Sequence, residues 1–243
     1  MESNQGSEKQ SHEINTTPSD WDRYFSSTKI DHSIMGIWAE HFVYSYHKYY
    51  GFSKSDVVLD FGAGLGDISF LVKDRVARIF LYDKSEYFLG QLGRKFASFP
   101  HIRVARSLLD VQGPVSLIII NSVIHYMTKS ELEEMLRALR DLCDSKTRII
   151  ISDIVPPGYS KLLDALSQLR TGLRKKFLKK LLWFILVNLR ENPKQSLSSS
   201  SFHLYGERDF KQILSRFGYT ARKTEKNFSF SNYRYTLECR LKD

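Results

Sequence analysis

The sequence of 243 residues has little cysteine and no long apolar run, and each of these absences limits what the chain can be. Its two cysteines, Cys143 and Cys239, do not have the spacing of a metal-binding or redox pair, so we expect no metal site and a reducing, cytoplasmic compartment. Residues 1–20 lack the apolar core of a secretion signal and are predicted to be a disordered lead-in. The mostly apolar run at 181–189 is too short to cross a bilayer, which needs about 20 residues.

Acidic residues are outnumbered by basic ones. The formal net charge of +9 favours an anionic partner, such as a nucleic acid, a lipid headgroup or a negatively charged substrate. Much of the excess lies in the segment 161–190, where Asp164 is the single acid among many Lys and Arg residues. The hydrophobic share of 42% is ample for a core, and we expect residues 21–243 to form one domain.

The most informative pattern lies between positions 57 and 68. An apolar, β-branched run predicts a buried parallel strand that ends in Asp60. Three glycines follow at two-residue spacing and predict a turn that lets the backbone approach a ligand before a helix begins. These glycines are Gly62, Gly64 and Gly66. A nicotinamide-binding fingerprint would need another glycine at position 67, and that residue is Asp67.

This D-x-G-x-G-x-G pattern resembles the first motif of the class I S-adenosylmethionine-dependent methyltransferases. The resemblance implies an α/β fold with three layers and a Rossmann-like, seven-stranded sheet, mostly parallel with an antiparallel last strand. It also implies S-adenosylmethionine as the cofactor, held by the residues of the motif. Those residues are Asp60, Gly62, Ala63, Gly64 and Gly66. From the residues alone, the alternative is a structural tight turn.

A second acid, Asp83, follows a predicted strand at 78–82 and lies 21 positions after Gly62. A carboxylate about 20 residues beyond a glycine turn suits the hydroxyl groups of a ribose. Asp83 and Lys84 also resemble the second motif of the same family, which implies that both contact the cofactor. The alternative is an ordinary aspartate that caps the next helix.

The chain departs from the family pattern after the third strand. Family members commonly have an acid there that contacts the adenine amino group, whereas this chain has 106–110, Arg-Ser-Leu-Leu-Asp. We expect Ser107, beside Leu108, or Asp110 to take the adenine contact. After the fourth strand, Asn121 corresponds to the residue beside the methionine portion of the cofactor.

The other predicted elements come from periodicity and capping residues. Strands are predicted at 101–105, 115–120, 148–152, 219–222 and 233–239, the last two joined by a hairpin loop at 227–232. Helices are predicted at 130–141, capped by Thr128 or Ser130, and at 207–216. A helical section from Trp21 through 38–50 precedes the first strand. The resemblance implies that this section shapes the acceptor pocket; the alternative is packing of its aromatic residues on the sheet.

Candidate catalytic residues follow the fourth and fifth strands, because ligands bind at the carboxyl ends of strands in open α/β sheets. His125 is the best-placed general base for a hydroxyl acceptor, or it packs the loop. Asp153 would orient that base or bind acceptor hydroxyls, or it caps the turn before Pro156. The candidate acceptor contacts are Tyr24, Tyr126, His203 and Tyr205.

A helical insertion is predicted at about 156–205, between breaks at Pro156-Pro157-Gly158 and Asn192-Pro193. Its apolar residues recur every three or four positions, which gives one stripe. The stripe comprises Leu162, Leu166, Leu169, Leu173, Phe177, Leu181 and Phe184. The segment is either a cap over the acceptor pocket with its stripe packed on the sheet, or a basic amphipathic helix that contacts anionic membrane through 161–190.

These observations predict a methyltransferase that acts on a small or amphiphilic molecule, lipid-like acceptors included, with oxygen as the methylated atom. An RNA methyltransferase is the alternative that the charge favours. Nucleic acid is the less favoured partner, because 121–124 is not the Asn/Asp-Pro-Pro-Tyr/Phe sequence and no RNA-binding module is appended. A non-catalytic cofactor-binding scaffold is the third hypothesis. The intact glycines and Asp83 argue against it.

Overall fold

The computed structural model describes residues 32–174, 182 and 203–242. The expected lead-in at 1–20, the helix expected from Trp21, and Tyr24 lie outside the described residues. So does all of the apolar run at 181–189 except Leu182.

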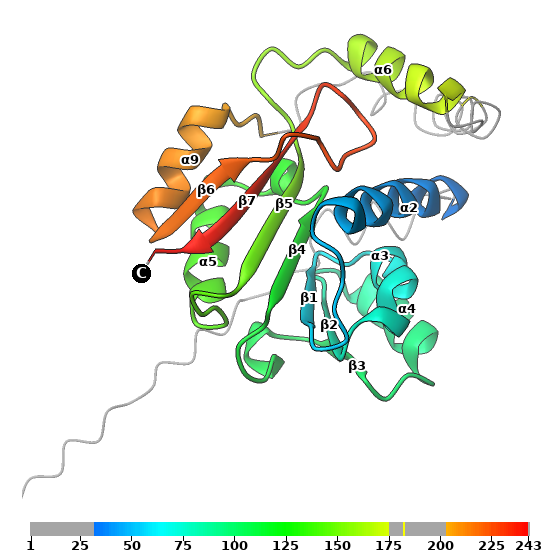
Figure 1. Ribbon diagram of the computed structural model, residues 1–243, viewed down its shortest axis with the longest axis vertical. Coiled ribbons are helices and arrows are strands. Elements are labelled where there is room, and N and C mark those ends of the chain that lie inside the picture. The colour runs from blue at the N-terminus through cyan, green and yellow to red at the C-terminus, as the bar shows by residue number, and fades with distance from the viewer. Residues whose placement is uncertain (1–31, 175–181, 183–202, 243) are drawn as a thin grey trace, which may run out of the picture.

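The described residues form three layers, a seven-stranded sheet between two layers of helices (Figure 1). The strand order is β3-β2-β1-β4-β5-β7-β6. The strands are β1 (Val57–Phe61), β2 (Arg78–Tyr82), β3 (Ile102–Ala105), β4 (Leu117–Asn121), β5 (Arg148–Ile154), β6 (Tyr219–Lys223) and β7 (Tyr235–Leu241). The pairs among β1 to β5 are parallel, and β7 is antiparallel to both β5 and β6, which confirms the predicted sheet.

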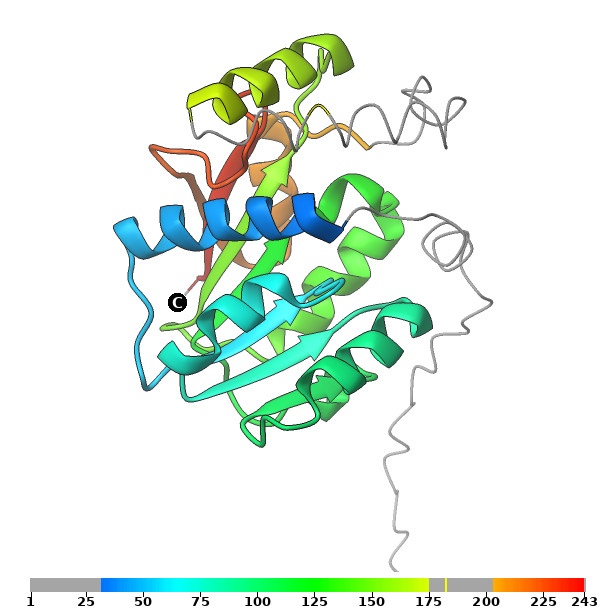
Figure 2. The same ribbon diagram turned by 90° about the vertical axis from the view of Figure 1, so that its right-hand side faces the viewer.

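Helices cover both faces of the sheet (Figure 1 and Figure 2). The α-helices are α2 (His32–Tyr49), α3 (Asp67–Val72), α4 (Glu86–Phe96), α5 (Lys129–Arg140), α6 (Lys161–Arg174) and α9 (Glu207–Arg216). The 3-10 helices are η1 (Lys73–Arg75), η2 (Leu108–Asp110) and η3 (Ile124–Tyr126). Side chains of α2, α3 and α4 pack on one face, and those of α5 and α9 pack on the other.

The central strands are apolar throughout because both of their faces are covered. In β4, Ile118 and Ile120 belong to the core beneath α5 and α9, whereas Leu117 and Ile119 belong to the core beneath α2 and α3. All four side chains are at most 2% exposed. Because β1 to β5 are parallel, the polar residues that follow them lie at one edge of the sheet, where the candidate site lies.

Of the two caps proposed for α5, the structure has Thr128. Its side chain accepts a hydrogen bond from the Glu131 N–H, and the Glu131 carboxylate accepts one from the Thr128 N–H, which is a capping box. Two aromatic residues of α2 pack in the core against the sheet: Phe42 and Tyr46 are 1% exposed and contact Phe228 of the loop between β6 and β7.

The apolar stripe of α6 does not pack on the sheet, so this part of the cap interpretation is wrong for the described residues. Leu162, Leu166 and Leu173 are 70%, 51% and 60% exposed, while Asp164 and Ser167 on the opposite side of the helix are buried. The inward side is polar because it meets polar partners in the β6–β7 loop. Among the described residues, no helix is both long and apolar enough to span a membrane.

Candidate active site

The glycine loop lies between β1 and α3, at the carboxyl end of β1. Gly62, Gly64 and Gly66 have φ angles of 71°, 54° and 67°, in the region that favours glycine. The N–H groups of Gly62 and Ala63 both donate to the Tyr82 carbonyl at the end of β2, at 2.8 and 3.0 Å. Gly66 is the N-cap of α3, so the loop delivers the chain into the helix as the motif predicts.

The three glycines face different surroundings. A Cβ at Gly62 would lie 2.4 Å from the Val123 side chain, and one at Gly66 would lie 2.6 Å from Phe96. No described atom lies within 4 Å of the Cβ position at Gly64. The outer two glycines are therefore required by packing inside the protein, whereas Gly64 faces open space in which backbone can approach a ligand.

Asp83 lies directly beside Gly64. Its Oδ2 accepts a hydrogen bond from the Gly64 N–H at 2.8 Å, and its Oδ1 accepts one from the Ser85 N–H at 2.9 Å. Ser85 is the residue that caps α4, since its hydroxyl accepts from the Phe88 N–H. The end of β2 thus supplies both a cap for the following helix and a half-buried carboxylate at the glycine loop.

Asp60 lies beneath the loop and is 3% exposed. Its Oδ2 accepts a hydrogen bond from the Ser69 hydroxyl at 2.6 Å, which ties β1 to α3. Burial raises the pKa of Asp60 to about 6, and the Asp83 and Asp67 carboxylates add to the rise. In this arrangement Asp60 supports the loop from inside the protein.

The remaining candidate cofactor residues lie at the carboxyl ends of β2, β3 and β4. The exposed Lys84 pairs with Glu131 of α5 at 2.8 Å. Ser107 caps η2 in a capping box with Asp110, whose Oδ2 accepts hydrogen bonds from two backbone N–H groups, while Leu108 is half-buried. Asn121 is half-buried at the end of β4, beside Ser152 of β5.

His125 lies in η3, just after β4, and is 1% exposed. Burial lowers the pKa of its ring to about 4, although the neighbouring Asp153 carboxylate acts in the opposite direction. The ring therefore stays neutral near pH 7, which is the form that can accept a proton. The His125 carbonyl accepts a hydrogen bond from the His203 N–H at 2.8 Å, which joins the end of the insertion to this segment.

Asp153 is buried close to His125 and holds three partners. Its carboxylate accepts hydrogen bonds from the Ser122 hydroxyl at 2.8 Å and from the Ser229 hydroxyl, and it pairs with Arg234 at 2.5 Å. Burial acts to raise the pKa of Asp153, but the Arg234 guanidinium and the two hydroxyls outweigh it and hold the pKa below its usual value. Asp153 is therefore an anion that orients its neighbours.

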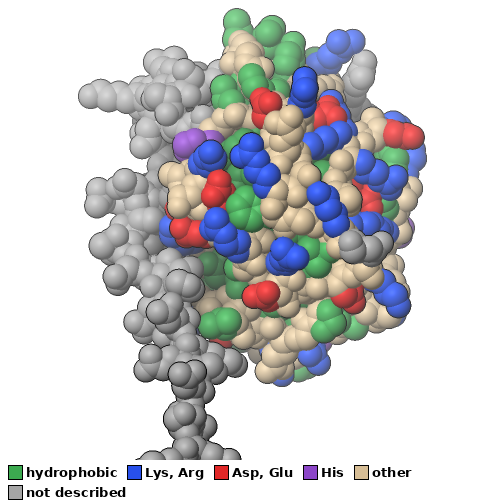
Figure 3. All heavy atoms as spheres, turned by 90° about the vertical axis from the view of Figure 1, so that its left-hand side faces the viewer, with side chains coloured by type: hydrophobic (Ala, Val, Ile, Leu, Met, Phe, Trp, Pro, Cys, Tyr) green, Lys and Arg blue, Asp and Glu red, His purple; other side chains and the backbone are tan. Residues whose placement is uncertain are grey.

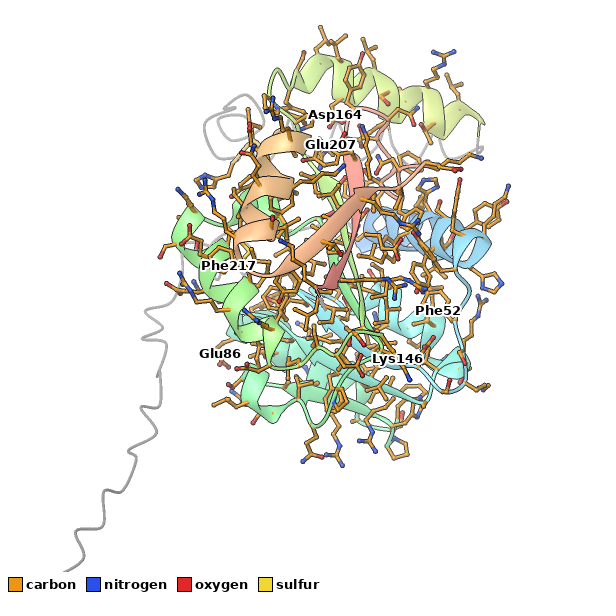
Figure 4. The ribbon with its side chains drawn as sticks, turned by 60° about the vertical axis from the view of Figure 1, so that its left-hand side comes forward. Phe52, Glu86, Lys146, Asp164, Glu207 and Phe217 are labelled. Carbon is orange, nitrogen blue, oxygen red and sulfur yellow. The ribbon has the colours of Figure 1, made fainter. Side chains whose placement is uncertain are left out.

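Arg234 and Asp164 complete this network, and the sequence analysis did not assign them to the site. Arg234 pairs with Asp164 of α6 at 3.0 Å, and Asp164 also accepts hydrogen bonds from Tyr159 and Ser231. Asp164 lies on the side of α6 that faces the rest of the protein (Figure 4). The one available signal was that Asp164 is the single acid in a strongly basic segment.

The candidate acceptor residues separate into two groups. Tyr126 is half-buried with its ring 4.0 Å from that of His125, and His203 is exposed at the end of the insertion. Tyr205 is 9% exposed and packs in the core with its ring 5.0 Å from Phe210, and its hydroxyl donates to the Met127 carbonyl at 3.4 Å. Tyr126 and His203 are thus the described candidates whose side chains are accessible to solvent.

Solved methyltransferases share this fold. Magnesium protoporphyrin IX methyltransferase from Synechocystis PCC 6803, solved with bound SAH, aligns with a TM-score of 0.54 at 18% identity, over 92% of this chain and 93% of its own. The mitomycin 7-O-methyltransferase MmcR aligns with a TM-score of 0.59 at 13% identity, over 91% and 56%. The pyocyanin biosynthetic protein PhzM aligns with a TM-score of 0.56 at 12% identity, over 84% and 55%.

The chain therefore has the class I, Rossmann-like methyltransferase fold that the first motif predicts. It spans little more than half the length of the last two proteins. No protein-family model matches the sequence, and no curated protein matches it. At such low identities the likeness shows the fold alone, so activity is argued from the residues of the site.

Proposed function

We propose that this protein is an S-adenosylmethionine-dependent methyltransferase acting on a small or amphiphilic molecule. The observation that carries the proposal is the pairing of Gly64 with Asp83. Gly64 faces open space, and its N–H donates to the Asp83 carboxylate at 2.8 Å. A backbone that a ligand can approach, beside an acid about 20 residues further along the chain, suits a nucleoside with free ribose hydroxyls.

The residues around this pair have distinct roles in the proposal. The backbone of Gly62, Ala63 and Gly66 shapes the loop, and Asp60 holds it from beneath through Ser69. Asp83 accepts hydrogen bonds from the ribose, with Lys84 at the rim of the site. Ser107 and Leu108 border the adenine, and Asn121 lies beside the methionine portion. S-adenosylmethionine supplies a methyl group on a positively charged sulfur, which is an excellent leaving group.

The protein contributes position and a proton acceptor. Methyl transfer is accelerated most when the acceptor atom is held in line with the methyl group and the sulfur, in a pocket that excludes water. For a hydroxyl acceptor, His125 takes the proton, because its ring is neutral near pH 7. Asp153 orients His125. Tyr126 contacts the acceptor, and so does His203 at the end of the insertion.

Oxygen of a small molecule is the acceptor we favour. The similar solved structures include a mitomycin 7-O-methyltransferase and a magnesium protoporphyrin IX methyltransferase, whose names specify small-molecule substrates. The exposed leucines of α6 favour an amphiphilic or lipid-like acceptor over a fully polar one. We take residues 21–243 as one domain that includes the insertion at 156–205, and we place the protein in the cytoplasm.

RNA is the less favoured substrate, because the basic side chains on the face that α9, β6 and α5 form alternate with acids. Figure 3 shows Lys and Arg spread with Asp and Glu between them over the face that α9, β6 and α5 form. Glu207 of α9 pairs with both Lys211 and Lys223, and Glu133 pairs with Arg137. A nucleic-acid surface would instead present a continuous basic stripe.

Calorimetric titration of the full chain with S-adenosylmethionine tests the proposal. We expect binding by the wild type and by Gly51→Val, and none by Gly64→Val. Gly51 is the matched control, because it also has a positive φ of 73° and no described atom near its Cβ position. Absence of heat with the folded wild type would refute the proposal. Cofactor binding without methylation of any extracted metabolite would favour the scaffold.

A further inference from the structure

The amphipathic helix α6 is oriented with its polar side inward. Figure 1 and Figure 2 show α6 as an outlying helix beyond the end of β5. Leu162, Leu166 and Leu173 are at least 51% exposed. At 100° per residue these leucines fall within an arc of about 40°. Exposed leucines on one helix face indicate a surface that contacts something apolar.

Specific bonds fix this orientation. On the inward side, Asp164 pairs with Arg234 at 3.0 Å, and the Ser167 hydroxyl accepts a hydrogen bond from the Asn232 N–H at 3.0 Å. Turning the leucines inward would break both and leave the buried Arg234 without one of its two acids, which is costly. The leucines therefore remain on the outside because the inward side is held by a buried ion pair.

The same ion pair removes negative charge from the outer surface. Asp164 is the single acid between 161 and 190, and it is buried against Arg234. Arg170 is exposed on the helix, and the sequence continues with Arg174, Lys175 and Lys176. Among its described residues, the outer surface of α6 thus combines leucines with Arg170 and has no acid.

We infer that the outer surface of α6, defined by Leu162, Leu166, Arg170 and Leu173, docks on an anionic lipid bilayer. Leucines enter the boundary between headgroups and acyl chains, and basic residues are attracted by acidic headgroups. A second copy of the chain is a poorer occupant, because each copy would present Arg170 and no described acid to the other, so neither surface offers the opposite charge. RNA would leave the leucines in water. This inference does not depend on the proposed methyltransferase activity.

The test is flotation of the full chain with vesicles of phosphatidylcholine alone or with phosphatidylserine added, at low and high salt. We expect binding to the phosphatidylserine vesicles that high salt weakens, and little binding to the neutral vesicles. Arg170→Gln should lower the partition coefficient about fivefold. Arg208→Gln, an exposed arginine on α9, is its matched control and should change nothing.

The leucines are tested in the same assay. Leu162→Ser combined with Leu166→Ser and Leu173→Ser should lower partitioning by about tenfold or more. Leu109→Ser is the control, because Leu109 is 90% exposed and lies far along the chain from α6. Since all of these leucines are exposed, circular dichroism should show unchanged thermal unfolding. Titration with S-adenosylmethionine, run on the same variants, separates a failure of docking from a failure of the proposed function.

Three results would overturn the inference. One is equal binding of the triple variant and the wild type. Another is the absence of binding to either kind of vesicle. The third is a concentration-dependent dimer in light scattering that the triple variant loses, which would show that a second copy covers the leucines.

Discussion

The Ser122 hydroxyl donates a hydrogen bond to the Asp153 carboxylate at 2.8 Å, and both residues have positive φ angles, 60° and 65°. Ser122 directly follows β4, and Asp153 is the last residue but one of β5, the parallel strand beside it. Among non-glycine residues, aspartate tolerates this region better than most, and serine visits it rarely. Two such residues bonded to each other show that the rim of the sheet is held in an uncommon conformation beside His125.

Backbone strain of this kind concentrates at functional sites, where the surrounding structure maintains it. Here the surrounding structure is the Arg234 network, which joins Asp153 at the rim to Asp164 in α6. Arg234 therefore links the position of α6 to the conformation of the rim. We expect a displacement of α6 to alter the position of Asp153 at the candidate acceptor site.

We expect Asp83→Ala to weaken S-adenosylmethionine binding by about 1.5–3 kcal/mol, because charged hydrogen bonds to the ribose are lost. Asp144→Ala serves as the comparison, since the Asp144 carboxylate accepts hydrogen bonds from the Lys146 and Thr147 N–H groups in the turn before β5 and is no part of the proposed cofactor site. Calorimetric titration of both variants gives the affinities. Equal affinities of Asp83→Ala and the wild type would remove Asp83 from the cofactor site.

His125→Ala should lower turnover by about 10²–10⁴-fold while leaving cofactor affinity nearly intact, if the acceptor is a hydroxyl. Because the pKa of His125 lies at about 4, the wild-type rate should stay flat near neutral pH and fall only as His125 becomes protonated toward pH 4. Steady-state rates across pH provide the measurement. A loss smaller than about tenfold would return His125 to a packing role.

The local signals in the sequence predicted the elements well. The strand predicted at 78–82 and the helix predicted at 207–216 have the observed bounds, since apolar runs and turn residues mark both ends. The bounds of α4 were not predicted, because Gly90 and Gly93 weaken the helical pattern inside it. Resemblance to a known motif identified the glycine loop, whereas the different surroundings of its glycines depend on Val123 and Phe96, which are distant in the sequence.

The rest of the site depends on contacts between distant segments. Arg234 meets Asp153 and Asp164 across 81 and 70 positions of sequence, and no local pattern marks such a pairing. The same contacts explain why the stripe of α6 lies outside, contrary to the cap interpretation. Periodicity shows that a helix has an apolar side but not which side finds partners, and here the polar side found them.

Two buried groups should make opposite contributions to stability across acidic pH. The pKa of His125 is about 4 in the folded protein, against 6.5 for the free residue, so below about pH 6.5 the unfolded chain binds a proton that the folded protein does not. The stabilisation is present above pH 6.5 and is lost as pH falls toward 4, by about 3 kcal/mol relative to His125→Gln.

Asp60 acts in the reverse direction, because its pKa is raised from 3.8 to about 6. The folded protein keeps a proton that the unfolded chain releases, so this contribution is present at low pH and is lost as pH rises through about 6. Asp60→Asn should therefore gain stability relative to the wild type, by about 2–3 kcal/mol, between about pH 4 and pH 7. Urea unfolding of the three proteins at several pH values measures both differences. Differences that do not vary with pH would contradict the assigned pKa values.

Arg234→Met should destabilise the protein strongly, because it leaves two buried carboxylates without their cation. The side chains of Asp153 and Asp164 are 11% and 4% exposed, and removal of one partner from a buried pair costs about 3–5 kcal/mol. For a protein of this size that corresponds to a fall in Tm of about 10 °C. Arg106→Met is the control: Arg106 and its partner Glu86 are both exposed, so its loss should cost about 1 kcal/mol at most.

Acid should partly rescue Arg234→Met. Without the guanidinium, burial raises the pKa of the Asp153 carboxyl group, and its protonation in acid neutralises uncompensated charge. The deficit in Tm should therefore be smaller at about pH 4 than at about pH 7, and Asp164→Asn combined with Arg234→Met should show a smaller deficit at both. Thermal unfolding followed by circular dichroism measures each of these. If Arg234→Met unfolded at the same temperature as Arg106→Met, the network would not be what holds α6 in place.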